Sequence, residues 1–139
     1  MNNLSEMLGK VGTDKMAVVV RIMRDNKMLI GLRNYKKEQW KKVSVWTTPG
    51  GRCGGDETFA QTLKREVFEE VGITDLKITD YLGNTPGAKE GDTLFVFKGE
   101  TNQEPRLMEP EKFSEWKWCP MDQIPDNFIN PKSLTLLNN

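Results

Sequence analysis

The fold of this chain is decided by residues 51–73, which read GRCGGDETFAQTLKREVFEEVGI. Thr58, followed three residues later by Gln61, forms a capping box, which is typical of the first turn of a helix. Gly72 can adopt the left-handed conformation that ends a helix. Between them, apolar residues recur at spacings of three and four, as on a helix with one buried face: Phe59, Ala60, Leu63, Val67 and Val71. The stretch therefore predicts a helix over residues 58–71, entered from a glycine-rich loop.

This helix carries three glutamates, Glu66, Glu69 and Glu70, within an arc of about 100° beside the apolar stripe. Like charges at this spacing repel one another, so something must offset them. Arg65 can neutralise one charge, and a divalent cation can neutralise the rest. Carboxylate oxygens suit Mg²⁺ or Mn²⁺, both of which keep open positions for substrate phosphates. Taken alone, the helix is explained equally well as an acidic surface helix.

Outward from this stretch, short β-branched or alternating segments predict further elements. We expect strands at residues 16–22, 28–33, 43–46, 76–82, 94–97 and 113–118. The polar turn at residues 25–27 is expected to join the first two as a hairpin. We also expect a turn of helix between Pro120 and Pro125 and a short helix over residues 133–137. Residues 1–14 read as a loosely held lead-in. Several strands interrupted by one long helix predict an α/β (α+β) fold, built as a single domain over residues 1–139.

Composition excludes several classes of protein. The chain has no histidine, which rules out His-based acid/base chemistry and His-ligated zinc. Cys53 and Cys119 are too few for a disulfide framework. With 20 basic and 20 acidic residues the formal net charge is zero, so bulk charge alone does not recruit a nucleic acid. There is no membrane-length apolar run and no secretory signal, so we expect no membrane partner and a cytoplasmic location.

Residues 51–73 resemble the Nudix box, G-x5-E-x7-R-E-U-x-E-E-x-G-U, where U is a bulky aliphatic residue. All nine specified positions match, from Gly51 and Glu57 through Arg65 and the three glutamates to Gly72 and Ile73. This pattern is far more specific than a lone glycine-rich motif. The resemblance, in particular to the MutT-like branch, implies a mixed β-sheet sandwiched between helices, with the box as a loop-helix-loop motif.

The resemblance also implies a reaction, the hydrolysis of a nucleoside diphosphate linked to another group, with Mg²⁺ or Mn²⁺ as cofactor. It implies that Glu66, Glu69 and Glu70 are metal ligands and that one of them orients or deprotonates the attacking water. The Gly51 carbonyl is a further candidate ligand, Arg65 is expected to pair with a box glutamate, and Gly72 is structural. The structural role expected of Glu57 is to brace the loop or the arginine.

Two kinds of site residue lie outside this motif. Many members of the family use another acidic residue as base or ligand, for which we expect Glu111, with Glu109 and Glu115 as alternatives. Arg33 ends a predicted strand near the box, and Arg52 lies within the loop, so both are candidates for binding substrate phosphates.

Enzymes of this family that act on ADP-ribose or dinucleoside polyphosphates tend to carry a proline or a tyrosine just past the box, and residues 88–91 have neither. The resemblance to the MutT-like branch therefore implies a nucleoside or deoxynucleoside triphosphate as substrate, split to the monophosphate and pyrophosphate. The 5′ end of an RNA, ADP-ribose and dinucleoside polyphosphates are alternatives. Residues 33–42 are basic with two aromatic side chains, which favours RNA, although a solvated loop explains them as well. A non-catalytic nucleotide-sensing module also remains open. We therefore expect a small nucleotide as partner and a nucleic acid less so, while a homodimer is compatible with the sequence.

Overall fold

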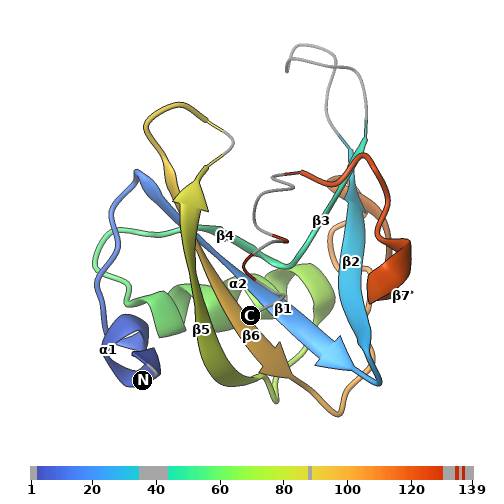
Figure 1. Cartoon of the computed structure of the whole chain (residues 1–139), viewed down its shortest axis with the longest axis horizontal. Helices are drawn as coiled ribbons and strands as arrows, with labels where there is room; N and C mark the ends of the chain where they lie inside the picture. Colours follow the sequence, from blue (N-terminus) through green and yellow to red (C-terminus); the bar gives the residue numbers. More distant parts are fainter. Residues whose placement is uncertain (1–2, 35–43, 88, 130–133, 135, 137–139) are drawn as a thin grey trace.

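The computed structural model describes residues 3–34, 44–87, 89–129, 134 and 136. Its elements, in chain order, are α1 (Leu4–Leu8), β1 (Met16–Arg24), β2 (Lys27–Arg33), β3 (Val45–Thr47), β4 (Gly50–Arg52), α2 (Phe59–Val71), β5 (Lys77–Pro86), β6 (Thr93–Glu100), β7 (Phe113–Pro120) and the 3-10 turn η1 (Met121–Gln123) (Figure 1). A mixed sheet with few helices confirms the predicted fold class. Most of the basic segment 33–42 and of the helix expected over residues 133–137 lies outside the described residues.

The predicted hairpin of β1 and β2 forms only at its tip, where Met23 pairs with Met28. Asp25 and Asn26 have φ values of 51° and 63°, the left-handed pair typical of a two-residue hairpin turn. Beyond the tip the two strands diverge. Strand β1 runs parallel to β6 and antiparallel to β4, whereas β2 pairs with β3 and β7. The chain segment from β3 to β4 therefore crosses the opening between β1 and β2 (Figure 1).

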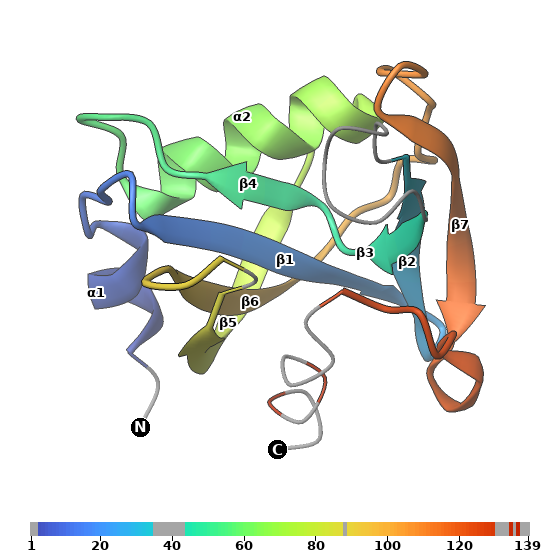
Figure 2. The same cartoon turned by 90° about the horizontal axis from the view of Figure 1, so that it is seen from above.

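Helix α2 covers one face of β4, β1 and β6 (Figure 2). Its buried stripe packs with alternate residues of the strands into one core, which includes Val18, Val20, Ile22, Phe59, Leu63, Val67, Phe95 and Phe97. The helix ends are as predicted. Thr58 Oγ1 accepts from Gln61 N at 3.2 Å, Gln61 Oε1 accepts from Thr58 N at 2.8 Å, and Gly72 has φ 71°.

Strand β4 was not predicted, because glycine disfavours strands and fills two of its three positions. The reason for glycine is close packing against β1. Gly50 has φ 149°, and a Cβ at this residue would lie 2.2 Å from the Val18 carbonyl oxygen. The two backbones therefore approach more closely than a side chain allows.

The segment expected to be a loosely held lead-in is instead anchored. Leu4, Met7 and Leu8 pack against the main core. Further along, Gly12 N donates to the Glu57 carbonyl at 3.1 Å and Phe59 N donates to the Lys10 carbonyl at 2.8 Å. These bonds tie the segment to the loop that precedes α2. No helix in the described part of the chain is long and apolar enough to cross a membrane.

Candidate active site

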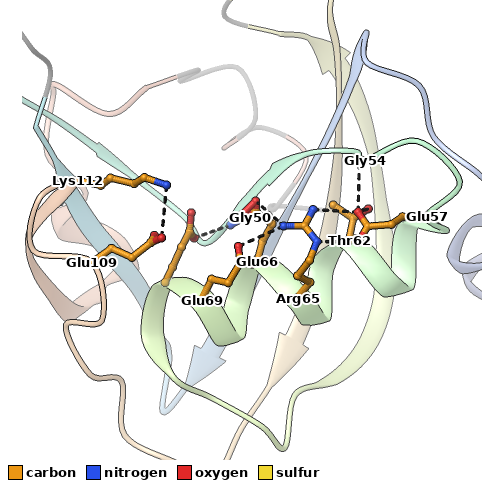
Figure 3. A network of polar contacts seen from close by, with 10 residues as sticks. Gly50, Gly54, Glu57, Thr62, Arg65, Glu66, Glu69, Glu109 and Lys112 are labelled. Atoms are coloured by element: carbon orange, nitrogen blue, oxygen red, sulfur yellow. Dashed lines mark hydrogen bonds and ion pairs between the residues drawn. The ribbon is translucent and has the colours of Figure 1, made fainter.

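Arg65 and Glu57 form the centre of a polar network along α2 (Figure 3). Arg65 Nε lies 2.6 Å from Glu57 Oε2 and Nη2 lies 2.9 Å from Glu57 Oε1, a two-pronged contact of the kind that guanidinium and carboxylate groups favour. Arg65 Nη1 also lies 3.2 Å from Glu69 Oε1 and 3.6 Å from Glu66 Oε2. One arginine therefore holds three carboxylates together.

Glu57 also ties the glycine-rich loop to the helix. Its Oε1 accepts from Gly54 N at 3.1 Å and from Thr62 Oγ1 at 3.0 Å. The Arg65 contact, followed by these two hydrogen bonds, lowers the pKa of Glu57 to about 2. The carboxylate is therefore ionised throughout the neutral range, as a fixed counter-charge for the arginine must be.

Glu70 is the most enclosed of the three helix glutamates, with 5% of the residue exposed. Its Oε1 accepts from Gly50 N at 3.0 Å, which links the last turn of α2 to β4. Burial raises the pKa of Glu70 well above its ordinary value, and the nearby charges of Glu66 and Glu109 raise it further. Burial is likewise the main cause of a raised pKa at Glu66. The array therefore holds crowded negative charge that a cation would stabilise.

Gly51 allows the β4 backbone to lie against Glu66, since a Cβ there would come within 2.3 Å of Glu66 Oε2. This contact places the Glu66 carboxylate against the β4 backbone, and carboxylate oxygens are ligands that fit Mg²⁺ or Mn²⁺. Among the described residues, no three acidic or cysteine side chains converge closely enough to bind a metal as they stand. Arg65 contacts one oxygen each of Glu66 and Glu69, and the second oxygen of each carboxylate can take part in a metal site while these ion pairs persist.

The loop before β7 brings one acidic side chain to this array. Glu109 is 20% exposed, pairs with Lys112 Nζ at 3.4 Å, and its charge raises the pKa of both Glu66 and Glu70 (Figure 3). Glu111 and Glu115 are exposed, and neither is among the largest causes of the pKa shifts of Glu66 and Glu70. The structure thus brings Glu109 toward the array and leaves Glu111, the residue first expected there, facing solvent.

A cleft of about 600 Å³ adjoins the array where β1 and β2 diverge. Glu70 lies at its wall, and so do both predicted phosphate-binding residues, Arg33 and Arg52. The positive charge of Arg33 lowers the pKa of Glu70, against the larger effect of burial. The sequence carried no signal for the other lining residues, which come from distant segments: Ala17, Val19, Thr47, Thr48, Gly87, Lys89, Asp92, Leu94, Phe113, Phe128 and Ile129.

Aromatic residues that alternate along the strands belong to the core. Phe95 and Phe97 contact Phe59, with ring centroids 4.7 Å and 6.2 Å away.

Cys53 is also buried, and burial raises the pKa of its thiol, so it is not poised as a nucleophile.

A model of the NUDIX domain matches residues 13–137. An NAD-capped RNA hydrolase NudC of Mannheimia succiniciproducens is 28% identical over 107 residues, covering 77% of this chain and 40% of that protein. An RNA pyrophosphohydrolase of Rickettsia bellii is 30% identical over 120 residues, covering 72% of this chain and 70% of that protein. The chain thus spans less than half the length of the NudC relatives that it matches.

Solved structures share the fold. A NUDIX hydrolase from Nitrosomonas europaea superposes with a TM-score of 0.72 at 20% identity, over 91% of this chain and 87% of that one. A MutT NUDIX hydrolase from Burkholderia pseudomallei superposes with a TM-score of 0.66 at 21% identity, over 88% and 95%.

Proposed function

Since the chain belongs to the NUDIX domain family, we propose that it is a divalent-metal-dependent pyrophosphohydrolase acting on a nucleoside diphosphate linked to another group. One observation carries the proposal. Arg65, itself bound by Glu57, holds Glu66 and Glu69, and Gly50 N holds Glu70 at the wall of a cleft of about 600 Å³. This volume lies within the range of about 300–1,000 Å³ of small-molecule sites. An acidic surface helix without a catalytic role does not explain why Glu70 is buried and lines this cleft.

Each residue has a role in this mechanism. Glu66, Glu69 and Glu70 would hold Mg²⁺ together with the Gly51 carbonyl, and the bound metal would neutralise phosphate charge and activate the attacking water. Gly50 N fixes the Glu70 carboxylate, and Arg65 fixes the spacing of Glu66 and Glu69. Arg33 and Arg52 supply positive charge on the cleft wall where phosphate oxygens would bind.

For the acidic residue outside the box we propose Glu109 in place of Glu111. Its side chain is sheltered, and its charge acts on Glu66 and Glu70. A carboxylate in this position can accept a proton from water or complete a set of metal ligands.

The proposed substrate is a free nucleoside or deoxynucleoside triphosphate, cleaved to the monophosphate and pyrophosphate. The cleft is largely apolar, and its volume of about 600 Å³ suits a single nucleotide. The second candidate is the 5′ end of an RNA. It is favoured by the similarity to proteins named NAD-capped RNA hydrolase and RNA pyrophosphohydrolase and by the basic sequence of residues 33–42.

A substrate panel tests the proposal. The protein is incubated with Mg²⁺ and nucleoside triphosphates, ADP-ribose, diadenosine polyphosphates, NAD-capped RNA and 5′-triphosphorylated RNA, and the products are separated by chromatography. Monophosphate and pyrophosphate from free triphosphates, lost in excess EDTA, are the expected result. Cleavage of RNA alone would replace the first candidate by the second. Full activity in EDTA, or no cleavage of any substrate, would contradict the enzyme assignment.

A further inference from the structure

Asp92 matches no sequence motif, yet its side chain is 8% exposed at the wall of the cleft. Its Oδ2 lies 2.8 Å from Arg52 Nη2. Arg52 Nη1 also donates to the Asp14 carbonyl at 2.8 Å. The guanidinium is therefore held by two partners on separate segments, one just before β1 and the other just before β6.

The register of β4 places this pair along the cleft. Arg52 pairs with Ala17 and Gly50 pairs with Val19, and residues two apart in a strand project from the same face about 7 Å from each other. Gly50 N is the group that binds Glu70. The cleft therefore has a carboxylate end at Glu70 and a guanidinium end at Arg52.

The loop that carries Asp92 is itself fixed. Gly87 N donates to the Asp92 carbonyl at 2.8 Å, and Thr93 N donates to the Lys15 carbonyl at 2.9 Å. Arginine has five N–H donors, and the contacts to Asp92 and Asp14 use two of them. The Arg52 side chain is 46% exposed, so its remaining donors are accessible to a ligand in the cleft.

We propose that Asp92 is a positioning residue that holds Arg52 so that its remaining N–H groups bind a second phosphate, or an equivalent oxyanion, of the substrate. This rests on the proposed function, since the first phosphate would lie at the glutamate end of the same cleft. A held guanidinium loses less side-chain freedom when it binds, which strengthens binding without new contacts.

If Asp92 acted only through its charge, its removal would change phosphate binding in the opposite direction. Asp92 is negative and lies at an anion site, so removing its charge alone would tighten the binding of a phosphate. Removing an anchor for Arg52 would weaken it. The direction of the change therefore separates the two explanations.

The test compares Arg52→Ala, Asp92→Ala and the double variant, with Glu104→Gln as a matched control. Arg24, like Arg52, binds a carboxylate (that of Glu104) and backbone carbonyl oxygens, but neither Arg24 nor Glu104 lines the cleft. Two readouts are used. They are KM and kcat for the triphosphate hydrolysed, and the Kd of α,β-methylene ATP, measured by calorimetry with Mg²⁺ present.

We expect Arg52→Ala and Asp92→Ala each to raise KM and Kd about tenfold, with kcat changed less than threefold. The double variant should be no worse than Arg52→Ala, because Asp92 acts through Arg52. Glu104→Gln should change neither constant.

An unchanged or lower Kd in Asp92→Ala, losses that multiply in the double variant, or no effect of Arg52→Ala would overturn the inference. So would failure of the parent protein to bind α,β-methylene ATP. If the parent binds this analogue but hydrolyses nothing, the proposed function fails and the Kd comparison still decides the role of Asp92.

Discussion

Among single residues, Glu70 combines burial with a hydrogen bond from Gly50 N, so its side chain has little freedom. Glu70→Gln keeps the size and one acceptor oxygen but removes the charge. We expect kcat to fall by roughly 10²–10⁴-fold, as when a preorganised charge is lost from an active site. Steady-state kinetics with Mg²⁺ measure this. Glu100→Gln, an exposed change at the end of β6, is the control. Turnover retained in Glu70→Gln would rule out its assigned role.

Glu109 and Glu111 offer a matched pair, because they lie two residues apart and differ in burial: Glu109 is partly buried and its charge raises the pKa of Glu66 and Glu70, whereas Glu111 is exposed. We expect Glu109→Gln to lower kcat by roughly 10–100-fold, the effect of losing a proton acceptor or a ligand. Glu111→Gln should remain within threefold of the parent. Equal losses, or a larger loss at Glu111, would restore the assignment made from the sequence.

The lowered pKa of Glu57 predicts that the free energy of unfolding depends on pH. Its folded pKa of about 2 lies below the ordinary value of 4.5, so the ionised form stabilises the fold above about pH 4.5 and this contribution is lost as pH falls towards 2. Glu57→Gln should therefore lower the urea midpoint at pH 7. The midpoints of parent and variant should approach each other between pH 4.5 and 2.5. A constant difference across this range would mean that the carboxylate charge contributes nothing.

Among the elements, the stability of α2 depends on the residues that cap its two ends. Gly72 has φ 71° and caps the helix through its N–H, which donates to the Phe68 carbonyl at 2.9 Å. A residue with a Cβ is strained in this conformation, so Gly72→Ala should cost about 1–2 kcal/mol of unfolding free energy. Gly55→Ala is the control, since a Cβ there meets nothing within 4 Å. Chemical denaturation of both variants checks this, and equal stability would contradict it.

On the scale of the whole molecule, the two cysteines belong to two separate core clusters, one beneath α2 and the other with Met28, Ile30, Trp46 and Phe128. Burial raises the pKa of both thiols, and a site that binds Mg²⁺ through oxygen ligands does not require a thiolate. Cys53→Ala with Cys119→Ala should turn over substrate within threefold of the parent. A kcat loss as large as that of Glu70→Gln would show that Cys53 takes part in the chemistry.

The sequence by itself determined what depends on near neighbours in the chain. The capping box, the glycine at the helix end and the row of glutamates follow from spacings of three and four, because helix geometry is the same wherever such a pattern occurs. The hairpin tip followed from its polar turn. The family motif supplied the residues of the box and, through them, the expected fold.

Only the tertiary structure decided which distant segments meet. It packed β4 against β1 through a glycine backbone and separated β1 from β2 beside a cleft. It also brought the charge of Glu109 to the helix glutamates and paired Asp92 with Arg52. None of these pairings follows from local propensity, because strand pairing and loop placement are set by which surfaces can be buried together across the whole chain. The helix could therefore be predicted from its own residues, whereas the cleft beside it could not.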